Sequence, residues 1–357
     1  MPAERPSTMQ LGPVALRSLL SDPEWRESPV TDGATPLVVV DLSAGAAPLE
    51  ALGARHVPAP GAAPWRVLVG CADAAPDGVP TDLFDVLLCS EPASSPWVAT
   101  SDLDGALATI ARTCAAAPAA ASVLAQVLRL NERLPMAAGT VVESLAYSTL
   151  LSGPEFAAWL SSSPRRAHRP AAEPVVVGTD EATGTVTVTL NRPEVRNAYD
   201  SATRDALIDV LRPLAELPDP PPVRLEGRGP SFCSGGDLSQ FGTTPDPVRG
   251  HAVRTSRAPG LLLRALRATA RVHGPCVGAG IELPAFCPVV QAAPDATFRL
   301  PEVPMGLIPG AGGTASILAR IGRHRTAYLA LSSVALAAEE ALAWGLVDAV
   351  ADWPGRG

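Results

Sequence analysis

The chain contains the stretch HGPCVGAGIEL at residues 273–283, preceded by SFCSGGD at 231–237 and followed by PEVPMGLIPGAGGT at 301–314. Glycine and other small residues allow backbone N–H groups to approach a bound molecule closely. Two N–H groups directed at one point form an oxyanion hole, which stabilises negative charge on a carbonyl oxygen. Glu282 and Glu302 lie in the second and third stretches, and carboxyl groups so placed can transfer protons. The three stretches therefore predict acid–base chemistry beside a carbonyl group.

The composition excludes several classes of protein. With 357 residues and a net charge of −8, the chain is long enough for two domains and too acidic to favour nucleic acid as a partner. All of its positively charged side chains are arginine, and the absence of lysine excludes a lysine Schiff base. The six cysteines form no CxxC pair, so we predict free thiols in a reducing compartment.

The sequence also lacks the signals of membrane insertion and of metal binding. No stretch reaches the length and hydrophobicity of a membrane span, and the N-terminal residues do not resemble a signal peptide. No group of histidine, cysteine and acidic residues has metal-ligand spacing. We therefore expect a cytoplasmic protein without a membrane partner and without a metal.

Hydrophobic periodicity divides the chain into four parts. Residues 1–35 are rich in proline, serine and charge and are expected to be poorly structured. Residues 36–165 begin with short apolar runs typical of strands and continue with a helical pattern. Residues 166–174 are predicted to be a linker, and residues 175–357 alternate strand and helix patterns as in an α/β domain.

Two residue-level expectations follow from the first three parts. A helix at about 137–151 would turn Val141, Leu145 and Leu150 toward the core, because these residues recur at helical spacing. His168 in the linker is expected to be solvated rather than to bind a ligand.

Five motifs in the last part resemble the crotonase (enoyl-CoA hydratase/isomerase) superfamily. They are NRPEVRNA at 191–198, FCSGGDL at 232–238, the two glutamate-containing stretches quoted above, and AWGLVD at 343–348. All five occur in the order of the family, over residues 175–350. The resemblance implies an α/β fold built as a crotonase-like spiral of ββα units, which binds acyl-CoA in a bent shape.

The resemblance also implies roles for matched residues. The main-chain N–H groups of Ser234 and Ala279 are expected to bind the thioester oxygen. Glu282 is expected to orient or deprotonate a water molecule, and Glu302 to deliver a proton to Cα. Two carboxyl groups that share one water do not both ionise easily, so one can stay protonated near neutral pH.

Further residues are expected to bind the substrate because they flank these groups or match the family's CoA-binding loop. They are Val195, Arg196, Phe232, Gly235, Gly278 and Gly310. Two readings stay open for two of them: Arg196 either pairs with a CoA phosphate or is solvated, and Gly310 either offers an N–H group or only forms a tight turn. Asp237 is interpreted as a turn or cap acid. CoA enters as part of the substrate, and no separate cofactor is implied.

One feature departs from the family. Ordinary members continue for several helices after the GLVD segment, whereas this sequence stops at Gly357. Residues 85–165 look like those helices, with Glu143, Tyr147 and the stretch GPEFAAWL at 153–160 resembling the family's terminal pattern. We hypothesise a permuted or duplicated segment that supplies the cap; the alternative is an unrelated N-terminal α/β module.

The sequence therefore predicts an acyl-CoA hydratase or dehydratase that acts on an enoyl-CoA thioester through an enolate. Two alternatives stay open, an enoyl-CoA double-bond isomerase and a non-catalytic partner subunit that keeps the fold. The family suggests a homo-oligomer, a trimer or a multiple of it.

Overall fold

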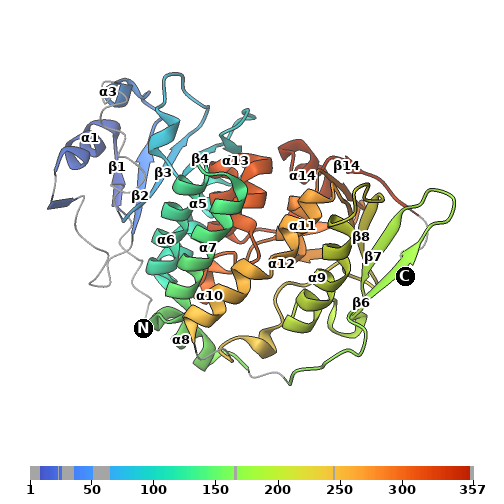
Figure 1. Ribbon diagram of the computed structural model, residues 1–357. Helices are drawn as coiled ribbons and strands as arrows, with labels where there is room; N and C mark the ends of the chain where they lie inside the picture. The colour runs from blue at the N-terminus through green and yellow to red at the C-terminus, as the bar shows by residue number, and fades with distance from the viewer. Residues whose placement is uncertain are drawn as a thin grey trace.

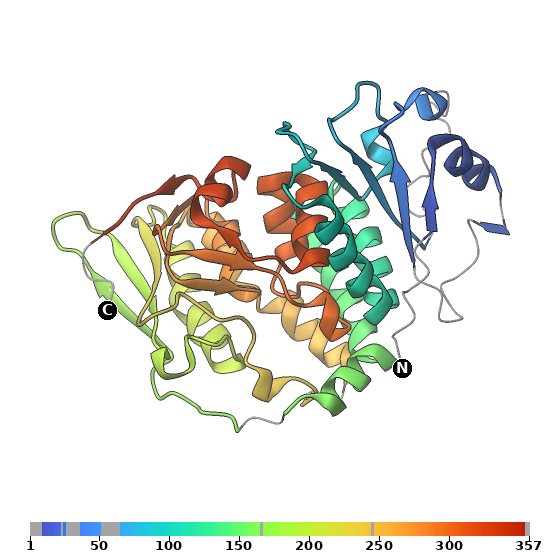
Figure 2. The same cartoon turned by 180° about the vertical axis from the view of Figure 1, so that it is seen from behind.

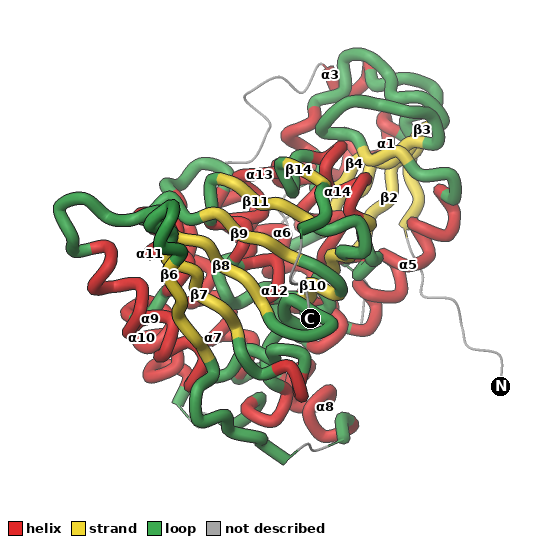
Figure 3. The backbone as a smooth tube through the Cα atoms, turned by 90° about the vertical axis from the view of Figure 1, so that its right-hand side faces the viewer, coloured by secondary structure: helices red, strands yellow, loops and turns green. Residues whose placement is uncertain are grey.

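Two β-sheets lie at opposite ends of the molecule, with a layer of helices between them (Figure 1, Figure 3). The structure is a computed structural model that describes residues 9–22, 24–25, 36–50, 65–164, 167–243 and 246–353. The mixed helix and strand content confirms the predicted α/β class.

The N-terminal sheet consists of parallel strands in the order β1-β2-β3-β4-β5. Its elements are β1 (Met9–Leu11), α1 (Pro13–Ser21), β2 (Leu37–Asp41), α3 (Ala47–Glu50), β3 (Val67–Ala72), the 3₁₀ helix η1 (Thr81–Leu83), β4 (Val86–Cys89) and β5 (Val98–Ala99). Its inner strands are continuously apolar because both faces are buried. Val38 and Val40 pack in a cluster with α1, whereas Leu37 and Val39 pack toward the central helices.

Four helices follow this sheet, namely α5 (Leu103–Ala116), α6 (Pro118–Asn131), α7 (Met136–Leu151) and α8 (Pro154–Ser162). Asp102 caps α5 by accepting a hydrogen bond from the Gly105 N–H. Pro118 opens α6, and the chain bends by 109° between α5 and α6. Within the described residues no lone helix meets the length and hydropathy of a membrane span; α5 and α6 meet them only when this bent pair is taken together.

The C-terminal part contains two more sheets. The larger has the order β14-β11-β9-β8-β7-β6 and is parallel except for the β6–β7 pair, and the smaller has the order β10-β12-β13. The strands are β6 (Val175–Thr179), β7 (Val186–Leu190), β8 (Val223–Gly227), β9 (Thr269–Val272), β10 (Pro275–Val277), β11 (Val289–Ala292), β12 (Thr297–Arg299), β13 (Leu336–Ala337) and β14 (Ala349–Val350).

The helices of this part cover the sheets, and the loops between them surround a central cavity. The α-helices are α9 (Ser201–Ala215), α10 (Pro247–Ser256), α11 (Pro259–Ala265), α12 (Ala279–Glu282), α13 (Gly313–Ser332) and α14 (Ala338–Trp344). The 3₁₀ helices are η2 (Pro193–Val195), η3 (Leu238–Gln240), η4 (Pro284–Phe286) and η5 (Val303–Met305).

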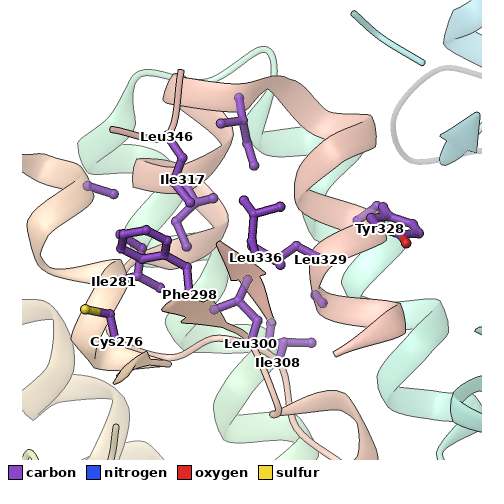
Figure 4. Packing of buried hydrophobic residues seen from close by; sticks show 14 of the residues in the cluster. Cys276, Ile281, Phe298, Leu300, Ile308, Ile317, Tyr328, Leu329, Leu336 and Leu346 are labelled. Carbon is purple, nitrogen blue, oxygen red and sulfur yellow. The ribbon is translucent and has the colours of Figure 1, made fainter. Parts of the chain in front are cut away.

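Helix α13 joins the two halves of the molecule. It packs against α5, α6 and α7 from the N-terminal half, which lie beside it in the view from behind (Figure 2), and against α12 from the C-terminal half. Ile317 and Leu329 of α13 lie among buried side chains of the small sheet, such as Phe298 and Leu336 (Figure 4). One hydrophobic cluster therefore extends from the N-terminal sheet through the helices to the large sheet.

The structure corrects the expectation for the N-terminus. Residues 9–21 form β1 and α1, with Leu16 and Leu20 buried, so the prediction of a poorly structured segment is wrong for them. Residues 1–8, 23 and 26–35 lie outside the described residues. The sequence pattern failed here because a three-residue strand and a nine-residue helix carry too little periodicity.

The inward face of α7 is also different from the prediction. Val141 and Leu145 are 40% and 53% exposed, and only Leu150 is buried as predicted. The buried face instead carries Glu143 and Ser144. This helix turns polar groups inward because it lines a cavity, which apolar periodicity cannot reveal.

Residues 167–174, within the predicted linker, contain no helix or strand. His168 is exposed, as expected, and its Nε2 atom also lies 3.0 Å from Oδ2 of Asp200. The histidine thus ties the linker to the start of α9.

A buried charged network fixes the N-terminal sheet to α6 and α13. Asp85 is 1% exposed and accepts hydrogen bonds from Arg129 and from the Leu68 N–H. Arg323 of α13, 2% exposed, lies 3.6 Å from Asp85 and donates to Glu132 and to the Phe84 carbonyl. Removing the Asp85 carboxylate would leave the positive charges of Arg129 and Arg323 without one of the negative charges that stabilise them.

We expect Asp85→Ala to lower the free energy of unfolding by about 3–5 kcal/mol, because an isolated buried charge is strongly unfavourable. Asp77→Ala, at an exposed carboxylate of the same half, should change it by less than about 0.5 kcal/mol. Urea unfolding measured for both variants compares the two; equal, small effects would contradict the proposed importance of Asp85.

Candidate active site

A cavity of about 620 Å³ lies where the helices of the two halves meet. Helices α7 and α8 form one wall, and helices α10 and α12, the loop before α13 and the starts of α9 and α11 form the others. Glu282, Glu302 and Ala279 all line this cavity, and so does Glu143 of α7. The volume is in the range of small-molecule sites.

Glu282 is held by the loop that begins α13. It is 2% exposed, and its Oε2 atom accepts hydrogen bonds from the N–H groups of Ala311 at 2.7 Å and Gly313 at 2.9 Å. Gly313 must lack a side chain, because a Cβ atom there would lie 2.7 Å from Cγ of Glu282. The carboxylate therefore has one fixed position at a helix N-terminus, where negative charge is favoured.

Glu143 approaches the same helix start from the other half of the molecule. It is 2% exposed, and it accepts hydrogen bonds from the Gly312 N–H at 2.7 Å and from both the N–H and the hydroxyl of Thr314 at 2.8 and 2.7 Å. The two glutamates thus take alternate N–H groups of one loop. This arrangement fixes both side chains relative to each other.

Glu302 has a different environment. Its Oε2 atom is shielded from solvent and has no hydrogen-bond partner among the described residues. A Cβ atom on Gly278 would lie 2.4 Å from Oε1 of Glu302 and 3.8 Å from Oε1 of Glu282, so both carboxyl groups approach this glycine. Gly278 also has a φ of +50°, which favours glycine.

Burial shifts the protonation equilibria of all three acids. Loss of hydration raises the pKa of Glu282 to about 7, although the hydrogen bonds from backbone N–H groups act in the opposite direction and lower it. The pKa of Glu143 rises to about 8, by burial first and by the neighbouring charge of Glu282 second. The same two causes raise the pKa of Glu302 well above its ordinary value. A proton donor and a proton acceptor can therefore coexist here near neutral pH.

Ala279, predicted to supply one oxyanion donor, lies at the cavity. Ala279 is the first residue of α12 and lines the cavity. The first N–H groups of a helix have no acceptor within the helix. This N–H is therefore available to a ligand beside Glu282.

The second predicted donor is not available in this structure. The Ser234 N–H donates to the Arg196 carbonyl at 2.9 Å, and Ser234 is not among the residues that line the cavity. Arg196 and Asn197 both have positive φ angles, 54° and 53°. The loop thus turns a carbonyl toward the amide that was predicted to meet a substrate.

Of the other predicted substrate-binding residues, one lines the cavity and five do not. Gly310 lines the cavity. A side chain there would collide with the Tyr147 ring, because a Cβ atom would lie 2.5 Å from it. Five predicted residues do not line the cavity: Val195, Arg196, Phe232, Gly235 and Gly278. Phe232 is a core residue, 1% exposed.

Asp237 acts as a cap acid, as predicted, by accepting hydrogen bonds from the N–H and the hydroxyl of Ser239. Together with His168 and Asp200 it forms a group whose ligand atoms lie within 4.8 Å of one another. The Arg192 guanidinium pairs with Asp200 and with Asp237, each at 3.0 Å. The protein itself thus supplies a positive charge between these acids.

All six cysteines are free and buried, as predicted. Burial raises the pKa of Cys233 to about 12, so the thiol in the first glycine turn is protonated. It therefore lacks the thiolate character of a nucleophile.

Glu143 and Tyr147 are the site residues that the sequence analysis quoted without a role at the site. Both belonged to the pattern of the suspected cap helices, and they lie one helical turn apart on α7. Their place at Glu282 and Gly310 depends on how α7 docks. Helices α7 and α8 line the cavity; that they replace the family's cap, by permutation or duplication, stays a prediction.

Comparison with known proteins agrees with the motifs. The sequence model described as enoyl-CoA hydratase/isomerase matches residues 180–352. The chain is 35% identical over 170 residues to a mevalonyl-coenzyme A hydratase of Aspergillus fumigatus, covering 46% of this chain and 62% of that protein. It is 32% identical to the 2,3-dehydroadipyl-CoA hydratase of Escherichia coli, with 46% and 64% covered. The chain thus spans less than two thirds of these two relatives.

Two further proteins are matched over a larger share of their own length. The 1,2-epoxyphenylacetyl-CoA isomerase of Escherichia coli is 34% identical, over 47% of this chain and 67% of that protein. A solved enoyl-CoA hydratase from Bacillus anthracis is 33% identical, over 50% of this chain and 70% of that one, with a TM-score of 0.46.

Glu143 should make stability depend on pH. Its folded-state pKa of about 8 lies above the ordinary value of 4.5, so the folded chain keeps a proton that the unfolded chain releases. This contribution is complete below the ordinary pKa and is lost as the pH rises toward 8.

We therefore expect the free energy of unfolding of the wild type to fall more steeply between pH 5 and 8 than that of Glu143→Gln. The difference in slope should be on the order of 1 kcal/mol per pH unit. Urea unfolding at several pH values measures it, with Glu339→Gln on the exposed side of α14 as the control. Equal slopes in all three proteins would show that Glu143 does not titrate in this range.

Proposed function

Because the chain belongs to the enoyl-CoA hydratase/isomerase family, we propose that it adds or removes water across the α,β double bond of an enoyl-CoA thioester. The observation that carries this proposal is the meeting of Glu282 and Glu302 at Gly278, beside the N–H of Ala279, in one cavity. Family membership supplies the substrate class, and this geometry supplies the acid and the base.

In the proposed reaction the two carboxyl groups have different roles. The Glu282 carboxylate lies at the start of α13 and accepts hydrogen bonds from two N–H groups there. These hydrogen bonds favour its ionised form, so it orients and deprotonates water. Glu302 has an Oε2 atom without a partner and a pKa well above the ordinary range, so it holds the proton that is delivered to Cα. In dehydration the same groups exchange roles.

The thioester oxygen becomes negatively charged as the enolate forms, and the Ala279 N–H is placed to stabilise that charge. A second donor at Ser234 requires that the Arg196 carbonyl release the amide. The oxyanion hole of the proposal is therefore complete only after this loop has rearranged.

The retained pair of carboxyl groups favours hydration over the two alternatives. Double-bond isomerisation moves a proton without water and needs one acid–base group. A non-catalytic subunit has no requirement for two buried acids with raised pKa values, since burying them is costly.

We expect Glu302→Gln and Glu282→Gln each to lower kcat/KM by about 10²–10⁴-fold, the usual contribution of a general acid or base. Incubation of trans-2-hexenoyl-CoA in ¹⁸O-labelled water, followed by mass spectrometry, detects the gain of one labelled water. Glu339→Gln serves as the control. Movement of the double bond without label would favour an isomerase, and equal inactivity of all proteins over a broad panel would favour the non-catalytic alternative.

A further inference from the structure

Among the described residues, one arginine of the cavity forms no ion pair, although the charge of the nearby Glu143 favours its protonated form. Three arginines line the cavity, and Arg204 and Arg257 both pair with Asp205, at 2.9 and 2.7 Å. None of the ion pairs among the described residues includes Arg254 of α10. A partly buried cation that shares no ion pair is stabilised when a ligand brings a negative charge to it.

The Arg254 guanidinium is fixed by neutral groups of α7. Its Nε atom donates to the Ser144 hydroxyl at 3.1 Å, and its Nη2 atom donates to the Ser144 carbonyl at 3.4 Å and to the Ser148 hydroxyl. The two N–H groups of Nη1 have no acceptor among the described residues. Burial lowers the pKa of Arg254, which shows that its charge has lost hydration. The side chain is therefore held in place, and the N–H groups of Nη1 can donate hydrogen bonds to a ligand.

Tyr147 lies between the Arg254 guanidinium and the loop that holds Glu282. The Tyr147 ring lies 4.8 Å below the Arg254 guanidinium, and it also packs against Gly310 of the loop that holds Glu282. One aromatic ring thus separates Arg254 from that loop. In coenzyme A the long pantetheine arm separates the phosphates from the thioester, so this position suits the acyl chain better than a phosphate.

We propose that Arg254 binds a carboxylate at the far end of the acyl chain, so that the site takes the CoA thioester of an unsaturated dicarboxylic acid. This inference rests on the proposed function, because the acyl chain is oriented by a thioester placed at Ala279. The planar guanidinium suits a carboxylate, which can accept two parallel N–H groups. Ser144 and Ser148 act as positioning residues for the guanidinium.

The test compares two saturated thioesters of equal carbon number, adipyl-CoA and hexanoyl-CoA, which bind without reacting. Isothermal titration calorimetry should show that the wild type binds adipyl-CoA on the order of 10- to 100-fold more tightly, as expected for hydrogen bonds to a charged group. Arg254→Met should lose this preference while keeping its affinity for hexanoyl-CoA, which also shows that the variant is folded. Arg254→Lys keeps the charge without the fork and should retain part of the preference.

The matched control is Arg249→Met, on the exposed side of the same helix, which should leave both affinities unchanged. Equal weakening of both ligands by Arg254→Met would show that the arginine binds a CoA phosphate and would overturn the proposal. So would equal affinity of the wild type for the two thioesters, a result that leaves hydration of hexenoyl-CoA untouched. A wild type that binds neither thioester would contradict the proposed function as well.

Discussion

The loop at the start of α13 is the feature on which the rest of the structure depends, because its N–H groups are shared by two buried carboxylates. Glu282 accepts from Ala311 and Gly313, and Glu143 accepts from Gly312 and Thr314. A helix start leaves N–H groups without acceptors and favours negative charge, so each carboxylate offsets part of the cost of its burial there. Since the N–H groups alternate between the two acids, a rotation of one carboxylate would disturb the hydrogen bonds of the other.

This shared loop makes the N-terminal helices part of the candidate site. Glu143 of α7 accepts a hydrogen bond from the Gly312 N–H, and Asn131 of α6 donates to the Thr314 hydroxyl and carbonyl. One hydrophobic cluster spans both halves. Residues on α7 can therefore alter the acidity of Glu282 through their charge, because Glu143 and Glu282 affect each other's protonation.

The sequence predicted the features that depend on local pattern. The glycine-rich turns, the strands of the C-terminal half and the meeting of Glu282 with Glu302 follow from motifs, in which a positive φ or a close approach admits only a small residue. The packing of α7 could not be predicted in this way: its buried face carries Glu143 and Ser144 while Leu145 is exposed. Apolar periodicity identifies a face that contacts a core, whereas this helix contacts a polar cavity formed by residues far away in sequence.

The same distinction explains why Ala279 and Ser234 differ, although both were assigned from equally clear motifs. The availability of the Ala279 N–H is a local property, since it follows from the start of a helix. That of Ser234 depends on a loop held by Asn197, which is 2% exposed, donates to the Arg228 and Ser231 carbonyls and accepts from the Arg192 N–H. These bonds keep the neighbouring Arg196 carbonyl on the Ser234 amide. In the proposed reaction, an acyl oxygen would therefore have to displace a hydrogen bond to reach the Ser234 N–H but none to reach the Ala279 N–H, so we expect the first contact at Ala279.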